Sequence, residues 1–432
     1  MAPVRALVLL VCLAAAPAWG AERATLDRPY DPVILPTGRL AALPDRRIDA
    51  LRLVRFEDGR AQPIPFQIDP RDGGGALVME GAEPSAFDDN DDFVFMAGDA
   101  GARASGAVWP DECDASLELA VRAPRGGGSA WAYLLHCPAA PRPTAVAPYV
   151  VYDRATNRAR SARYEVGYAA DRNYFTDMRV VGADGSPGAN LLRQTRMRGS
   201  PTFALLVADL TLEFTEQTTY VEVEGVRNGP VRAIRRAKLS VDLGKLFPNL
   251  PSGTAETFHY RSAFLTPTRF GIPALALRLL RDFHFEDVVE FNPLVMPLRY
   301  WDATHPDGIA LASAGPPAED AADHEWWVHS TPDGAVLNAL MIPQQWRDWG
   351  ITRGAFVRPG CADPAATTCA AGYTLRNMTA LRAAGDYDLM QATVVLPRPY
   401  RAGDEVPAMA MLSDPLEVEV RALRTPPFEK GG

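Results

Sequence analysis

The chain has 432 residues, of which 47% are hydrophobic and 22% are charged, and its formal net charge at pH 7 is −9. This composition provides enough apolar side chains for a large core and argues against intrinsic disorder. The acidic balance argues against nucleic acid as the main partner, because phosphate backbones are bound by basic surfaces.

The first twenty residues predict a secretory signal peptide. A basic start at Arg5 precedes an apolar run over residues 6–16, and small residues flank Trp19 at its end, which indicates cleavage after Gly20. The run is shorter than the roughly 20 apolar residues that span a bilayer, and no later run reaches that length. We therefore expect a periplasmic or secreted protein with no transmembrane segment after cleavage.

Strands separated by turns are predicted along the mature chain. The sequence contains 38 prolines and 34 glycines, which break up long helices. Alternation of apolar and polar residues predicts strands over 211–226, 238–243 and 416–421. Only short helices are expected, over 274–282 and 344–349.

The predicted fold class is all-β, with two sandwich-like parts. A connector rich in Pro and Ala at residues 139–148 predicts the boundary between them. The expected parts are a small N-terminal β-domain over residues 21–140 and a large β-sandwich domain over residues 146–425.

Four cysteines of the mature chain form two groups that are local in sequence, namely Cys113 with Cys137 and Cys361 with Cys369. Structural disulfides in an oxidising compartment are favoured over metal binding, because neither CxxC spacing nor a histidine at ligand spacing accompanies them. Pairing within each group is one of three connectivities that the sequence allows.

An acidic run lies within residues 87–99, just before an apolar segment, and residues 67–73 add further carboxylates beside a glycine-rich turn. Closely spaced carboxylates repel one another unless a cation or solvent relieves them, and hard oxygen ligands suit Ca²⁺. The spacing does not match an EF-hand loop, so a solvated acidic turn is the alternative. The candidate calcium ligands are Asp69, Asp72, Asp88, Asp89 and Asp91.

Five tryptophans fall within residues 301–349, with three histidines among them. Flat aromatic faces with polar neighbours suit sugar rings, although large aromatic side chains are also common in cores. The candidate ligand-binding residues are Trp301, Trp326, Trp327, Trp346 and Trp349.

Candidate catalytic residues are His259, Tyr260 and His284. A histidine beside a carboxylate can act as a general base, and His284 is followed closely by Glu286. A structural role is the alternative for each of them. The sequence contains none of the GxSxG, HExxH, GxGxxG or P-loop motifs, which lowers the hydrolase, zinc-protease, dinucleotide and nucleotide hypotheses.

Two short patches carry a resemblance to a known superfamily. Residues 229–236 (GPVRAIRR) and residues 63–69 (PIPFQID) resemble strands of secreted β-supersandwich proteins of the galactose-mutarotase-like superfamily, some of them polysaccharide-lyase-like. The resemblance implies a β-sandwich fold and a role with carbohydrates. No acid or base residue of that superfamily matches a position of this chain.

These patterns predict an exported β-sandwich protein that recognises a carbohydrate-like ligand. One alternative is a polysaccharide lyase or epimerase on the same scaffold, in which His259 or His284 removes a proton next to a carboxylate and Tyr260 or an arginine stabilises the enolate. Another alternative is an envelope accessory protein that binds other proteins.

Overall fold

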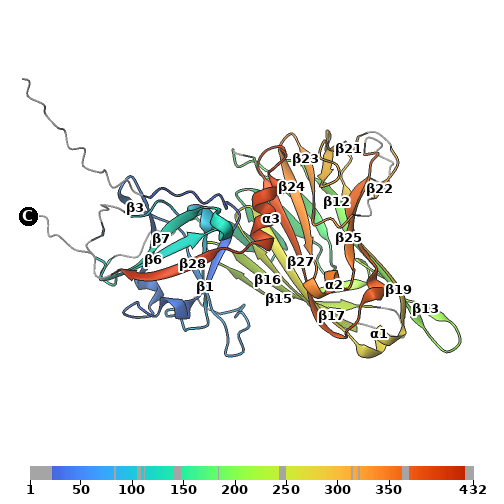
Figure 1. Cartoon of the computed structure of the whole chain (residues 1–432), viewed down its shortest axis with the longest axis horizontal. Helices are drawn as coiled ribbons and strands as arrows, with labels where there is room; N and C mark the ends of the chain where they lie inside the picture. The colour runs from blue at the N-terminus through green and yellow to red at the C-terminus, as the bar shows by residue number, and fades with distance from the viewer. Residues whose placement is uncertain are drawn as a thin grey trace, which may run out of the picture.

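The computed structural model describes residues 22–81, 84–104, 109–110, 112–140, 147–182, 184–242, 250–312, 315–319, 322–361 and 369–423. The predicted signal peptide lies outside these residues. Strands are the dominant secondary structure of the described part, which confirms the predicted all-β fold class (Figure 1). None of its helices is long and apolar enough to cross a membrane.

A smaller N-terminal module consists of two sheets around one apolar core. Apolar side chains such as Phe93, Phe95, Leu119 and Leu134 fill that core. The three-stranded sheet has the order β1 (Pro32–Pro36), β5 (Asp92–Met96), β4 (Gln67–Asp69). The five-stranded sheet has the order β28 (Glu417–Leu423), β6 (Ala115–Arg122), β7 (Ser129–His136), β2 (Leu51–Glu57), β3 (Arg60–Pro63).

The C-terminal strand β28 belongs to this N-terminal module, whereas the predicted boundaries placed it in the large sandwich. It runs antiparallel to β6, with Val418 opposite Val121 and Val420 opposite Leu119. Figure 1 shows this red strand beside the cyan strands of the module. The apolar face of the strand packs against the module core, and such packing partners cannot be read from alternation alone.

The large sandwich is built from two sheets of nine and seven strands. The nine-stranded sheet has the order β15 (Thr219–Asn228), β16 (Ala233–Val241), β17 (Leu250–His259), β18 (Ala263–Ile272), β27 (Gly385–Leu396), β24 (Gly334–Met341), β23 (Trp326–Thr331), β20 (Arg299–Asp302), β21 (Ile309–Ala310). The seven-stranded sheet has the order β13 (Asp209–Thr211), β12 (Leu192–Ala204), β19 (Leu280–Phe291), β26 (Ala370–Arg376), β25 (Thr352–Arg358), β22 (Ala318–Glu319), with β14 (Phe214–Thr215) also paired to β12.

Side chains from both of these sheets meet in one core, which includes Tyr300 and Trp327 from the first and Phe291 and Tyr373 from the second. A further four-stranded sheet packs against the nine-stranded sheet around Tyr164, Phe264 and their neighbours. Its order is β11 (Phe175–Val180), β10 (Tyr164–Tyr168), β9 (Arg158–Ser161), β8 (Val150–Asp153).

Three short α-helices are present in the described residues. Helices α1 (Ala274–Leu279) and α2 (Gln344–Asp348) lie within the two predicted ranges. Helix α3 (Glu405–Ser413) was not predicted and packs on the nine-stranded sheet through Ala408 and its neighbours. It contains Pro407, which is tolerated because it lies in the first turn, where a backbone N–H has no partner within the helix.

Both disulfides are local. Cys113 is bonded to Cys137, with Cα atoms 3.9 Å apart, and Cys361 is bonded to Cys369, with Cα atoms 4.9 Å apart. The first bond joins the residues that flank the antiparallel pair β6 and β7. Of the three connectivities that the sequence allowed, the structure therefore has the one with pairing inside each group.

Candidate functional site

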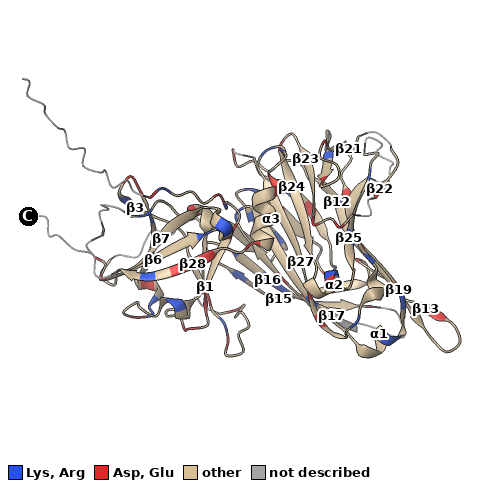
Figure 2. Cartoon of the chain, in the orientation of Figure 1, with Lys and Arg blue, Asp and Glu red and all other residues tan. Residues whose placement is uncertain are grey.

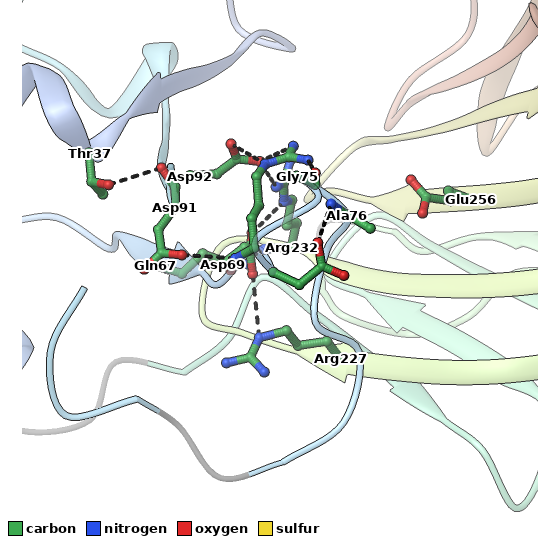
Figure 3. A network of polar contacts seen from close by, with 12 residues as sticks. Thr37, Gln67, Asp69, Gly75, Ala76, Asp91, Asp92, Arg227, Arg232 and Glu256 are labelled. Atoms are coloured by element: carbon green, nitrogen blue, oxygen red, sulfur yellow. Dashed lines mark hydrogen bonds and ion pairs between the residues drawn. The ribbon is translucent and has the colours of Figure 1, made fainter. Parts of the chain in front are cut away.

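The two sequence patches that carried the superfamily resemblance lie against each other where the N-terminal module meets the large sandwich (Figure 3). The side-chain oxygen of Gln67 accepts hydrogen bonds from the backbone N–H groups of Val231 at 2.9 Å and Arg232 at 2.8 Å. A Cβ atom at Gly229 would collide with the amide of Gln67, so this position requires glycine. The two patches are therefore the two sides of one contact.

A buried charge network surrounds this contact. The Nε atom of Arg232 donates to Oδ2 of Asp69 at 2.8 Å, and its Nη2 atom donates to Oδ2 of Asp92 at 3.2 Å. Its Nη1 atom donates to the hydroxyl of Tyr260 at 3.2 Å. Arg71 binds Asp92 from the other side through two hydrogen bonds of 2.9 and 2.7 Å.

Arg232 keeps its charge in this site although it is 1% exposed. Burial by itself lowers the pKa of the guanidinium, but Tyr260 and Asp69 outweigh that effect and raise it. The carboxylates are buried as well, and guanidinium groups already bind them. The network therefore acts as a structural connection between the two parts of the protein rather than as an open substrate site.

The candidate calcium ligands are not gathered around one point. Oδ1 of Asp72 accepts the backbone N–H groups of Gly74 at 2.8 Å and Ala76 at 3.0 Å, which closes a turn. Asp91 accepts the N–H groups of Arg71 at 2.8 Å and Asp88 at 3.0 Å.

Two further candidates for calcium binding also have partners in the protein. Asp89 forms an exposed ion pair with Arg46 at 2.7 Å, and the backbone carbonyl of Asp88 accepts from the hydroxyl of Thr37. Across the described ranges, no group of three or more His, Cys, Asp or Glu side chains is arranged to hold a metal ion. Calcium binding remains a prediction.

The candidate catalytic residues are placed in separate environments. His259 on β17 is fully buried, and its ring nitrogens contact the hydroxyls of Tyr164 at 3.1 Å and Tyr168 at 2.9 Å. Burial, assisted by Arg235, lowers the pKa of His259 to about 3, so its imidazole is neutral at physiological pH. Tyr260 is part of the charge network described above.

His284 lies on β19 in the opposite sheet, where its half-exposed ring is 3.4 Å from a carboxylate oxygen of Glu286. The structure therefore does not bring His259 and His284 together. A general base that accepts a proton from a substrate needs a free nitrogen within hydrogen-bond reach of that substrate, and both nitrogens of His259 are occupied inside the core.

The five clustered tryptophans divide into two sets. Trp327 and Trp346 are buried in the core between the two large sheets, and Trp349 lies at the edge of that core. Trp301 and Trp326 lie on the other face of the nine-stranded sheet, where they pack with the residues around α3. Trp301 and Trp326 are therefore the two of the five that share an outer face of the sheet.

Trp301 on β20 and Trp326 on the adjacent strand β23 both contact the ring of Tyr400, with centroid distances of 5.2 and 6.5 Å. Both indoles are half-buried. Gly308 has a φ of 72°, and a Cβ atom there would collide with the indole of Trp301. We call the side chains of Trp301, Trp326 and Tyr400 the aromatic platform.

Polar groups surround the aromatic platform. The guanidinium of Arg299 lies 5.5 Å from the ring centre of Trp301. The hydroxyl of Tyr400 donates to Glu405 at 2.6 Å, and Arg398 binds Asp404 through two hydrogen bonds of 2.7 Å. Sequence reasoning missed Tyr400 and its neighbours, because they are far from the tryptophan-rich segment and carry no recognisable motif.

A separate hollow of about 410 Å³ lies at the end of the N-terminal module. It is formed by the turn between β6 and β7, the chain near Thr25 and the start of β28. Its charged lining residues are Arg122, Arg125 and Glu417, so it contains none of the candidate site residues.

No family model and no curated protein matches the chain. Among solved structures, an alpha-mannosidase from Enterococcus faecalis V583 aligns with 93% of this chain at 10% sequence identity and a TM-score of 0.47. The chain covers 46% of that protein, about half of its length. At this TM-score the similarity does not indicate a function. The all-β fold class follows from the strands of the structure itself.

Proposed function

We propose that this protein is an exported β-sandwich protein that binds a carbohydrate-like ligand at the aromatic platform. The observation that carries the proposal is the pair of half-buried indoles, Trp301 and Trp326, on adjacent strands against one tyrosine. Indole faces stack on the C–H faces of sugar rings, and nearby charged groups can bind the hydroxyl edges.

The platform is held in place before any ligand arrives. Tyr400 contacts both indoles, and its hydroxyl is fixed by Glu405 at the start of α3. Gly308 leaves room for the indole of Trp301 against the turn between β20 and β21. Side chains that are already ordered lose little entropy on binding, which favours affinity for a weakly held ligand such as a sugar.

Export is part of the proposal. The signal-like N-terminal sequence and the two disulfides support it, since structural disulfides persist in oxidising compartments. The placement of its candidate bases does not support the alternative of a lyase or epimerase, because both ring nitrogens of His259 contact tyrosine hydroxyls and His284 lies on the opposite sheet. We therefore assign binding and no catalytic step.

A glycan array followed by titration calorimetry with the best ligand tests this proposal on the purified mature protein. We expect Trp301→Ala and Trp326→Ala each to weaken binding about tenfold or more, which corresponds to about 1.4 kcal/mol. Trp349→Ala is the matched control, because this half-buried indole belongs to the core edge and should leave affinity unchanged.

Two results would contradict the proposal: the wild-type protein binds no glycan, or Trp301→Ala and Trp326→Ala both bind as well as wild type. Repeating the titration with a calcium chelator tests the predicted cofactor separately. A loss of binding or of thermal stability in the chelator, restored by added Ca²⁺, would support a calcium site.

A further inference from the structure

An apolar hairpin tip projects from the large sandwich. Strands β12 and β13 form the hairpin, and Figure 1 shows it extending beyond the sheets at the end away from the N-terminal module. At its tip Leu205 is 50% exposed, and Leu206 and Val207 are fully exposed. Three consecutive aliphatic residues at a loop tip are unusual, since tips are normally polar and extended exposed apolar surface marks interaction sites.

The base of the hairpin is firmly held. Phe203 pairs with Leu210 and Ala204 with Asp209 across the hairpin, while β12 is paired along its other edge with β19. The hydroxyls of Thr202 and Thr211 also bond to each other at 2.9 Å. The apolar tip is therefore presented by an ordered ladder at a defined place on the surface.

Helix α1 provides a second apolar element at the same end. None of its residues is buried, and Leu275 is 67% exposed. The helix leads directly into β19, where Leu280 pairs with Phe203 at the hairpin base. Two exposed apolar elements from distant parts of the chain thus lie next to each other.

We propose that this hairpin tip, together with α1, docks the protein on a lipid surface. Three aliphatic side chains offer only about 300 Å² of apolar surface, which is well below the roughly 800 Å² per partner of a stable protein interface. A lipid surface needs no complementary shape, so a small projecting tip suits it better than it suits a protein partner.

The backbone of the hairpin tip limits how deeply it can enter a lipid bilayer. The hairpin ladder ends at the pair Ala204–Asp209, so the peptide groups of residues 205–208 lie beyond it. Peptide groups without protein partners need water, which restricts the tip to the boundary between headgroups and acyl chains.

Charge at this end of the molecule is mixed. Exposed Arg278 lies in α1 and exposed Arg281 in β19, while Asp209 lies in β13 and Asp282 in β19; Figure 2 shows charges of both signs at this end of the molecule. Positive and negative groups therefore offset each other. We expect docking to depend on the apolar tip and to be similar for neutral and anionic lipids.

Vesicle co-flotation of the mature protein tests the proposal, with phosphatidylcholine vesicles in one arm and phosphatidylcholine–phosphatidylglycerol vesicles in the other. We expect the wild-type protein to float with both, and the double variant L206D/V207D to lose about tenfold or more of its partitioning. Leu294→Asp is the matched control, because Leu294 is 84% exposed on another turn and should float as wild type does.

The tip variant should fold normally, because the substituted side chains are exposed, and circular dichroism with thermal melting checks this. The proposal is overturned if the wild-type protein floats with neither vesicle, or if L206D/V207D floats as well as wild type. It is also overturned if flotation needs anionic lipid, or if the tip instead mediates self-association that L206D/V207D abolishes in gel filtration. None of these readouts involves the aromatic platform.

Discussion

Arg232 and Asp69 form an ion pair of 2.8 Å in which the two side chains are 2% and 1% exposed, although they are 163 residues apart in sequence. Asp69 ends strand β4 of the N-terminal module, and Arg232 immediately precedes β16 of the large sandwich. Ion pairs buried this deeply are costly to break, because the remaining charge stays without its partner in a medium of low polarity.

Removing the guanidinium of Arg232 should strongly destabilise the protein. We expect Arg232→Ala to lower the free energy of unfolding by about 3–5 kcal/mol, because it leaves Asp69 buried without its main guanidinium partner and removes one of the two guanidinium groups that bind Asp92. Arg269→Ala is the control. Arg269 forms an ion pair with Asp388 through two hydrogen bonds, but this pair is exposed and should contribute less than about 1 kcal/mol. Urea denaturation measures the free energy of unfolding of both variants. Equal losses of stability would contradict a special role for the buried network.

Stability should fall as pH decreases from about 6.5, because two buried histidines resist protonation. Burial lowers the pKa of His259 and of His329 to about 3, compared with 6.5 for a free histidine. Below pH 6.5 the unfolded chain takes up protons at these histidines that the folded chain does not. The contribution of the two neutral histidines to the free energy of unfolding is therefore complete above that pH and is lost as the pH falls below it. The slope should approach about 2.7 kcal/mol per pH unit for two groups.

Urea denaturation between about pH 5 and 6.5 measures this slope in an Asp287→Asn background, because the pKa of Asp287 is raised to about 6 and its titration acts on the slope with the opposite sign. His259→Gln should reduce the slope by about half, because one proton is then no longer taken up on unfolding. His329→Gln should reduce the slope in the same way, since burial keeps this ring neutral too. A slope that is the same in all three proteins would show that His259 is not kept neutral by the fold.

Asp287 should destabilise the folded protein at neutral pH. Burial raises the pKa of this carboxyl to about 6, and Gln391 donates to it at 2.6 Å across the two large sheets. The folded state favours the protonated form of Asp287. The stabilisation that this protonated carboxyl provides is present below the unfolded pKa near 3.8 and is lost as pH rises through about 6.

Asp287→Asn keeps an acceptor for Gln391 and removes the charge. We expect the variant to be more stable than wild type by about 1–2 kcal/mol at pH 7.5 and equally stable near pH 4. The expected gain is smaller than the free energy that corresponds to the whole pKa shift, because the side chain of Asp287 is partly exposed. Paired urea curves at the two pH values give the comparison. A variant less stable than wild type at pH 7.5 would contradict the assigned pKa direction.

Strand β28 should be required for the stability of the N-terminal module. Val420 lies opposite Leu119 and packs against the module core, so Val420→Asp places a charge in an apolar contact and should cost about 2 kcal/mol or more. Glu419→Gln is the control, because Glu419 forms an exposed pair with Arg122 at 3.0 Å. Limited proteolysis should cut the first variant faster, and equal digestion would show that β28 is dispensable.

The candidate sites were harder to predict than the strands, for a reason that Trp326 and Trp327 illustrate. They are adjacent in sequence, but successive side chains of a strand point to opposite faces, so Trp327 enters the core and Trp326 joins the outer platform. Clustering along the chain therefore did not mean clustering in space. The acidic run similarly gave no sign of all its cationic partners, because one of the two arginines that bind Asp92 is Arg232, which is 140 residues away in sequence.

The sequence by itself determined local features of this protein: the all-β class, strands within a few segments such as 416–421, and two of the three short α-helices of the described residues. These follow from alternation, turn residues and composition, which act over a few neighbouring residues. Only the tertiary structure decided that β28 completes the N-terminal sheet, that Arg232 joins Asp69, and that Tyr400 lies against both Trp301 and Trp326. Those relationships depend on packing between residues far apart in the chain, and local patterns carry no information about such partners.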